Sequence, residues 1–130
     1  GKGKFVYLPW EAGSLYYRYS SHNHAALLAD LIDHLLPVGR QLRTNAHPLV
    51  EITVMRQRNR TLVHFVNLTG HSQTGYFDPI PIRDIRVGPA AEFRTARWVR
   101  TGKQLPVRRD GRFSEFILPE IQGYEVVVLE

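Results

Sequence analysis

The segment "LVEITVMRQRNRTLVHFVNLT", residues 49–69, contains two runs in which apolar and polar residues alternate. The first run places three β-branched residues on one face, at Val50, Ile52 and Val54. This period of two is typical of a strand with one buried face. The polar triplet "RNR" interrupts the alternation, and apolar residues resume directly after it. The segment therefore predicts an antiparallel hairpin with strands at 49–57 and 61–69.

Further runs with strand character follow this hairpin at intervals of about ten residues. They are 82–87, 92–100, 103–109, 112–119 and 124–130. The "RDGR" sequence between two of them is typical of a tight turn, and the Gly-, Ser-, Asp- and Pro-rich segment 70–81 is expected to be a loop. Short strands with this spacing predict an antiparallel β-sandwich, so the fold class is mainly β, and we assign the sandwich to residues 44–130.

The sequence before residue 44 has a different pattern. The apolar run "KFVYLP" (4–9) predicts a short buried strand that ends at Pro9, and the aromatic stretch after it is expected to be a loop. Apolar residues at helical spacing in "HNHAALLADLIDHLL" (22–36) predict one helix, the only one of the chain. Ser20 or Ser21 is expected to cap it, and Pro37 to end it.

One strand and one helix cannot cover both faces of a sheet. We therefore interpret residues 1–43 as the last strand–helix unit of an upstream α/β domain, and the start of the chain as a point inside a larger protein. The strand at 4–9 would lack its neighbours, so self-association into a homo-oligomer is expected.

Composition excludes several classes of protein. A chain of 130 residues with 43% hydrophobic and 22% charged residues has the composition of a globular protein. Its apolar runs are too short to span a bilayer, so we expect a soluble protein with no membrane partner. The absence of cysteine excludes disulfides, thiolate zinc sites and a cysteine nucleophile. The compartment is left open, either cytoplasmic or exported.

The net charge of +5 arises in one segment, 83–112. It contains nine basic residues against three acidic ones. Such an excess is one sign of nucleic acid binding. However, Arg94, Arg97 and Arg100 are interleaved with apolar residues, which favours the solvent-exposed face of strands. Nucleic acid is therefore an alternative partner that the pattern disfavours.

The candidate binding residues lie in "YLPWEAGSLYYRYSS" (7–21). An acid beside aromatic rings is how proteins hold sugar hydroxyls and C–H faces, and aromatic residues after a strand also pack with their polar tips in water. The stretch is interpreted either as a sugar-binding surface or as an interface, with Tyr7 and Trp10 packed against neighbours. The candidate residues for sugar or interface contacts are Trp10, Glu11, Tyr16, Tyr17 and Tyr19, with Trp98 as an additional stacking platform.

The sequence shows no arrangement expected of a catalytic or metal site. Asp30 and Asp33 are close enough on the helix to form a glycosidase pair, but solvated acids are also expected beside an apolar stripe. His22 and His24 point in different directions once a helix begins, and a zinc site needs three or four convergent ligands. His64 is expected to be a satisfied, half-buried histidine. We predict no catalytic residue, no metal ligand and no cofactor.

Three segments together resemble the C-terminal region of bacterial, β-galactosidase-like glycoside hydrolases. They are "GKGKFVYLPWEAG" (1–13), a helix ending in "LLADLIDHLLP" (27–37), and "VEITVMRQRNRTLVHFVNLTG" (50–70). "IPIRDIRV" (80–87) resembles the segment that commonly follows in that family. The resemblance implies a catalytic barrel, then a trimerisation-type, amidotransferase-like domain, then a C-terminal β-sandwich. The barrel carries the family's catalytic carboxylates, and the matching segments contain none.

The resemblance implies a non-catalytic accessory domain that braces the catalytic barrel and the subunit contacts of a glycoside hydrolase-like protein. Its partners would be the upstream domains of the parent chain, further copies of the chain, and carbohydrate. The alternative function is a carbohydrate-binding module that uses its exposed aromatic residues. We expect no hydrolase activity from residues 1–130 by themselves.

Overall fold

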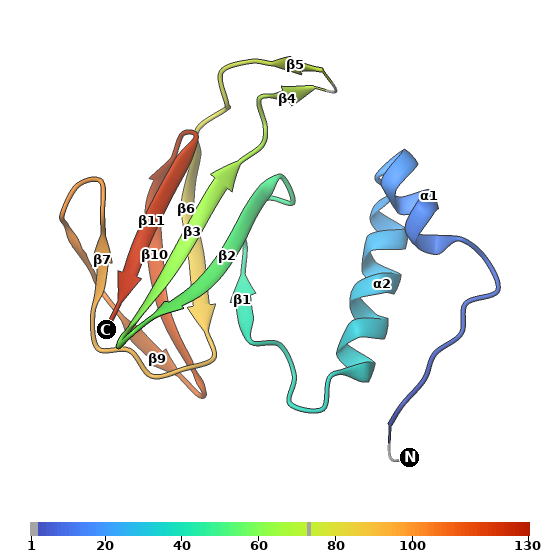
Figure 1. Ribbon diagram of the computed structural model, residues 1–130, viewed down its shortest axis with the longest axis horizontal. Coiled ribbons are helices and arrows are strands. Elements are labelled where there is room, and N and C mark those ends of the chain that lie inside the picture. The colour runs from blue at the N-terminus through green and yellow to red at the C-terminus, as the bar shows by residue number, and fades with distance from the viewer. Residues whose placement is uncertain (1–2, 73) are drawn as a thin grey trace. The chain divides into compact units, whose positions relative to one another are not determined.

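The computed structural model describes residues 3–72 and 74–130, and the chain divides into two compact units, Gly1–Arg40 and Gln41–Glu130 (Figure 1). The first unit contains helices and the second contains strands, so the mainly β fold class is confirmed. No helix within the described ranges is long and apolar enough to cross a membrane.

The first unit contains two helices, α1 (Ala12–Tyr19) and α2 (His22–Leu35). The helix α2 confirms the predicted one, and its N-cap is Ser21, whose side chain makes no capping hydrogen bond. The helix α1 corrects the expectation of a loop. Gly13 and Ser14 are weak helix formers that hide its start in the sequence. It ends at Ser20, whose left-handed backbone (φ 49°) lets its N–H bond the carbonyl of Tyr16.

The predicted buried strand at 4–9 is wrong. This segment has no regular secondary structure, and Phe5 and Tyr7 are exposed. A strand needs a neighbour to accept and donate its backbone hydrogen bonds, and residues 3–40 contain no other strand. The segment is held instead through Lys4, whose Nζ donates to the carbonyl of His34 at 3.0 Å.

The first unit buries very little apolar surface. Ala12 is its only buried hydrophobic residue among those described, and α2 has no buried residue. The predicted apolar stripe of α2 is therefore only partly covered, and Ile32 and Leu35 remain exposed. The described residues of this unit form two helices but no hydrophobic core.

The predicted hairpin forms from β2 (Val50–Gln57) and β3 (Arg60–Asn67). The strands pair without interruption from Val50 opposite Asn67 to Gln57 opposite Arg60. The two residues between them make the turn, where Arg58 adopts φ 55°. Alternate side chains of β3 are buried, as the period of two predicts.

Two antiparallel sheets form the sandwich of the second unit (Figure 1). One consists of β1 (Leu42–Thr44), β6 (Ile82–Pro89), β10 (Phe113–Ile121) and β9 (Arg108–Asp110) in that spatial order. The other consists of β2, β3, β11 (Tyr124–Leu129), β7 (Ala96–Trp98) and β8 (Gln104–Leu105). Their inner faces share one hydrophobic core, to which both sheets contribute large residues, including Phe65, Ile85, Phe116, Leu118 and Leu129.

Several elements differ from the sequence prediction. The strand β1 was not expected, and the predicted loop 70–81 contains a small pair, β4 (His71–Ser72) and β5 (Gly75–Tyr76). The run 92–100 is a strand only over Ala96–Trp98. The run 103–109 divides into β8 and β9, which belong to different sheets. Pro106 lies between them, and since proline lacks a backbone N–H it ends the ladder there.

Candidate functional site

The structure places the predicted aromatic residues on α1 and just before it. Trp10 and Glu11 precede the helix, and Glu11 occupies the N-cap position without a side-chain capping bond. The side chains of Tyr16, Tyr17 and Tyr19 are exposed. Tyr7 and Trp10 are exposed in this chain because the predicted strand at 4–9 does not form, and their packing against a neighbouring domain or subunit stays a prediction.

The acids of α2 do not form a catalytic pair. Asp33 makes two hydrogen bonds with the guanidinium of Arg40, at 2.6 and 2.7 Å. The hydrogen bonds from Arg40 lower the pKa of Asp33 below its ordinary value. A lowered pKa is the opposite of what a general acid requires.

The histidines do not converge either. Within the described part of the chain, no three His, Asp or Glu side chains come together as a metal site. His64 only partly matches its prediction, because its Nδ1 lies 2.6 Å from the hydroxyl of Tyr124 while its buried Nε2 has no hydrogen-bond partner.

The motif "NLTG" (67–70) forms a polar network under the loop 68–81. The amide of Asn67, which is 1% exposed, donates to the carbonyls of Ile80 (2.8 Å) and Gln122 (2.6 Å). Its carbonyl oxygen accepts from the backbone N–H (3.1 Å) and the hydroxyl (2.8 Å) of Thr69. The N–H of Ile80 completes the network by donating to the Thr69 hydroxyl at 2.8 Å. This Asn67 network attaches both ends of the loop to the sandwich.

The attached loop presents an aromatic surface, formed by Tyr76, Phe77 and Tyr124. The three side chains line a shallow pocket of about 710 Å³ together with Val66, Asp78, Pro79 and Gly123. The loop closes where the N–H of Phe77 bonds the carbonyl of Gly70 at 2.8 Å. A Cβ at residue 70 would lie 2.1 Å from the carbonyl oxygen of Phe77, so only glycine fits there. Sequence reasoning missed this surface, although an aromatic pair in a Gly- and Pro-rich loop is a usable signal.

A second groove, of about 690 Å³, lies on the sheet that contains β1. Arg43 dominates it and pairs with Asp110 (2.5 Å) and Glu115 (2.8 Å). The side chain of Arg43 extends over Gly88 of β6, and a Cβ added at Gly88 would lie 3.1 Å from the Cγ of Arg43. Its guanidinium lies 4.5 Å from the ring of Phe113. Both carboxylates of this groove are therefore held by one arginine.

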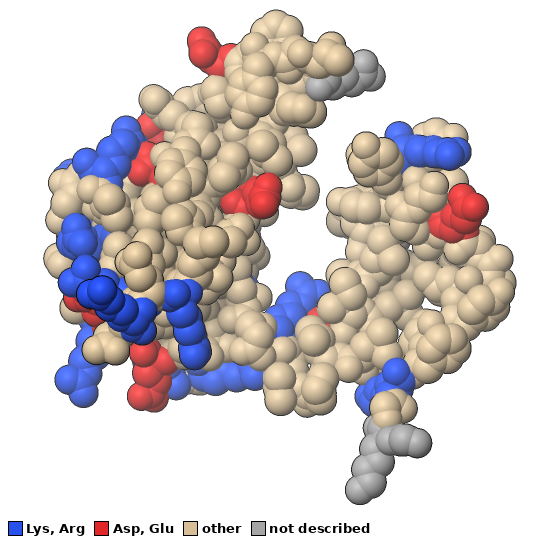
Figure 2. Space-filling model, viewed as in Figure 1, with Lys and Arg blue, Asp and Glu red and all other residues tan. Residues whose placement is uncertain are grey.

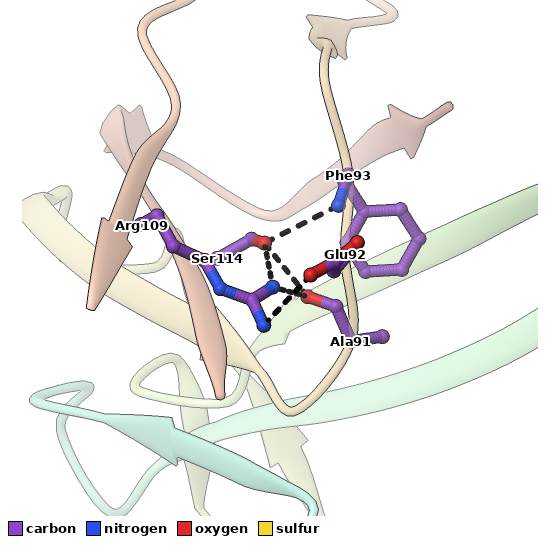
Figure 3. A network of polar contacts seen from close by, with 5 residues as sticks. All are labelled: Ala91, Glu92, Phe93, Arg109 and Ser114. Carbon is purple, nitrogen blue, oxygen red and sulfur yellow. Dashed lines mark hydrogen bonds and ion pairs between the residues drawn. The ribbon is translucent and has the colours of Figure 1, made fainter. Parts of the chain in front are cut away.

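Polar contacts also fix the segment 91–93 to the sandwich (Figure 3). The buried hydroxyl of Ser114 donates to the carbonyl of Ala91 at 2.7 Å and accepts from the N–H of Phe93 at 3.2 Å. Arg109 donates to the same carbonyl and pairs with Glu92 at 3.2 Å. These contacts brace a loop and leave no group free for chemistry.

The arginines of 83–112 are distributed over both sheets. Arg83 pairs with Glu120 in one sheet, and Arg100 pairs with Glu125 in the other. Figure 2 shows basic side chains on this face of the sandwich with acidic ones among them. Trp98 is buried in the core, which excludes it as a stacking platform.

No family model matches the sequence, and no curated protein matches it. Several solved structures are similar in fold, and two of them are described here. Alpha-L-fucosidase isoenzyme 2 from Paenibacillus thiaminolyticus is 16% identical, with a TM-score of 0.79 over 93% of this chain and 20% of its own. A cycloisomaltooligosaccharide glucanotransferase from Paenibacillus sp., solved with cycloisomaltoheptaose, is 15% identical, with a TM-score of 0.53 over 68% of this chain and 16% of its own.

The coverage of these two matches differs in an informative way. Gln41–Glu130 makes up 90 of the 130 residues, so a match over 93% of the chain extends into Gly1–Arg40. The chain spans about a fifth of the length of the fucosidase and less of the glucanotransferase. It is therefore similar in fold to a small part of two much larger enzymes.

Proposed function

We propose that this chain is a non-catalytic accessory part of a larger glycoside hydrolase-like protein. The observation that carries the proposal is the fucosidase match, in which nearly the whole chain corresponds to a fifth of an enzyme. In this proposal the sandwich braces the catalytic domain. The helical unit is the end of an α/β domain of the trimerisation type, which supplies subunit contacts.

The state of the carboxylates supports a non-catalytic role. A glycosidase requires one carboxylic acid with a raised pKa and a second carboxylate across the sugar. Asp110 and Glu115 share a groove, but both are ion-paired with Arg43. The hydrogen bond from Arg43 lowers the pKa of Asp110, so this acid releases its proton more readily instead of retaining it for a leaving group.

The exposed apolar residues of the first unit support the proposal that this unit packs against another part of a larger protein. A unit that buries one alanine leaves Phe5, Tyr7, Ile32 and Leu35 in water. Several large apolar side chains exposed on one small unit are typical of a surface that another part of a protein covers. In this proposal the upstream part of the parent chain covers it.

Two measurements test the proposal. The isolated chain is expected to release no aryl alcohol from a panel of aryl fucosides, galactosides and glucosides. The full-length product of the gene is compared with a product that lacks residues 41–130, and the shortened product is expected to lose stability or assembly. Turnover by the isolated chain, or a full-length product without a catalytic domain, would contradict the proposal.

The alternative is a carbohydrate-binding module centred on α1. The exposure of Trp10, Tyr17 and Tyr19 favours it. Because Trp98 is buried, a sugar-dependent change in tryptophan fluorescence that disappears in Trp10→Ala would report binding there. A flat response leaves the accessory role as the better explanation.

A further inference from the structure

We infer that the aromatic surface of Tyr76, Phe77 and Tyr124 is a binding site for a neutral saccharide. The inference deepens the proposed function, on which it rests, by giving the accessory domain a ligand. It concerns residues of the sandwich that are separate from the aromatic residues of α1.

The exposure of the three rings is the first observation. Tyr76 is 67% exposed, Phe77 69% and Tyr124 56%, in a unit whose other phenylalanines are buried (Phe65, Phe116) or partly buried (Phe93, Phe113). The rings line one pocket of about 710 Å³, a size typical of small-molecule sites. Clustered, exposed aromatic rings beside a pocket indicate a surface that another molecule covers.

The charge of the surface selects the class of ligand. No lysine or arginine occurs in the sequence between Arg60 and Arg83, and Asp78 is the only acid of that span. In Figure 2 the basic side chains gather away from the β4–β5 hairpin. An anionic ligand would find no cation here, and a cationic one would approach a protein with a net charge of +5. A neutral ligand fits both facts.

The polar groups of the pocket fit hydroxyl groups. The Asp78 carboxylate makes no hydrogen bond or ion pair with any residue that the structure describes, so its oxygens can accept hydrogen bonds from two hydroxyl groups of a ligand. A sugar ring has an apolar C–H face and a rim of hydroxyls. Its face can pack on an aromatic ring while a carboxylate receives its hydroxyls in strong, charge-assisted hydrogen bonds.

The surface is organised before any ligand arrives. The Asn67 network holds both ends of the loop, and Phe77 bonds Gly70 through its backbone. The Tyr124 hydroxyl is fixed by His64 at 2.6 Å. Ordering a loop on binding lowers affinity, and here the protein already holds both ends of the loop in place.

The test is a titration of the whole isotope-labelled chain, followed by amide NMR shifts. The probes are maltoheptaose, cellohexaose, xylohexaose and L-fucose. We expect saturable shifts at Gly75, Phe77 and Gly123 with at least one of them. Tyr76→Ala is expected to weaken binding about tenfold, and Asp78→Asn, which keeps the shape of the side chain, to weaken it several-fold.

Met55→Ala is the control, because Met55 is a 54% exposed apolar residue of β2 outside both aromatic surfaces and its truncation should leave the affinity unchanged. The amide spectrum of each variant shows whether it is folded, and Tyr124→Phe provides a variant that keeps the ring if Tyr76→Ala unfolds. We expect Tyr124→Phe to retain most of the binding.

Three results would overturn the inference. They are a flat response to every probe at millimolar concentration, shifts confined to α1 that disappear in Trp10→Ala, and equal affinity in Tyr76→Ala and the unmodified chain. None of these bears on the accessory role, which depends on the absence of turnover and on the full-length product. The two proposals therefore fail separately.

Discussion

The indole Nε1 of Trp98 donates a 2.5 Å hydrogen bond to the carboxylate of Glu125, which is 3% exposed. The other carboxylate oxygen pairs with Arg100 at 2.5 Å, and the Arg100 guanidinium lies 5.1 Å from the Trp98 ring. These contacts join β7 to β11 at the place where Trp98 pairs with Val127. Both carboxylate oxygens of the buried Glu125 therefore have a partner, and removing this side chain should destabilise the fold.

Glu125→Ala is expected to lower the free energy of unfolding by about 1–3 kcal/mol, because it leaves the buried indole N–H without an acceptor. Urea unfolding followed by tryptophan fluorescence measures it. The control is Glu120→Ala, which breaks an ion pair with the exposed Arg83 and should cost less than about 1 kcal/mol. Equal losses in the two variants would show that the indole contact contributes nothing.

Asn67→Asp should disrupt the Asn67 network although the two side chains have the same shape. The new carboxylate oxygen would face the carbonyls of Ile80 and Gln122, which accept but cannot donate. We expect the free energy of unfolding to fall by more than about 2 kcal/mol, and hydrogen exchange at the amide of Phe77 to become faster. Asn59→Asp, in the exposed hairpin turn, should change neither quantity. Unchanged exchange at Phe77 would contradict the proposed attachment of the loop.

Two glycines should respond oppositely to alanine. Gly70→Ala would place a Cβ against the backbone of Phe77 and should destabilise the chain, because backbone cannot move aside as a flexible side chain can. Gly13 lies in α1 with open space around it. Gly13→Ala should therefore increase the helix content and raise the free energy of unfolding by about 0.5 kcal/mol. Circular dichroism and thermal unfolding measure both effects. Similar stability in the two variants would mean that the loop relaxes around residue 70.

The Arg43–Asp110 contact should make the stability of the folded protein depend on pH. The hydrogen bond from Arg43 lowers the pKa of Asp110 below 3.8, so the folded protein binds this proton more weakly than the unfolded chain. The contribution is complete above the unfolded pKa and is lost as pH falls through the lowered folded value. The stability difference between the unmodified chain and Asp110→Asn should therefore shrink below about pH 4. A difference that is constant with pH, or that persists in an Arg43→Met background, would contradict this.

The two units should differ in autonomy. Residues 41–130 contain the hydrophobic core and should unfold cooperatively without the rest of the chain. Residues 1–40 bury one alanine, and a helix of 14 residues is marginal in water, so this fragment should show low helicity and no cooperative transition. Calorimetry and circular dichroism of the two fragments test whether each one folds without the other. A sharp transition in the shorter fragment would show that it needs no neighbours.

The sequence predicted the elements whose pattern is local. The hairpin 49–69 and the helix α2 were found because alternation and helical spacing extend over many residues. The strand at 4–9 was wrong because an apolar run becomes a strand only beside a partner.

The candidate surfaces were harder to predict because they depend on distant contacts. Tyr76 and Tyr124 are 48 positions apart in the sequence, and the network that brings them together is centred on a residue outside both segments. The burial of Glu125 could have been predicted from the sequence, because Glu125 lies on the same side of β11 as Val127 and Leu129. An acid in register with core residues indicates a buried partner.

The position of Asn67 also has a consequence for how this protein is produced. "NLT" (67–69) and "NRT" (59–61) are both acceptor triplets for N-linked glycans. A glycan on Asn67 would occupy the same amide nitrogen that bonds Ile80 and Gln122, so glycosylation and folding exclude each other at this residue. Asn59 lies in an exposed turn and would tolerate the sugar. In a eukaryotic secretory host, Asn67 would be modified only on chains that have not yet folded, and those chains could not close the sandwich.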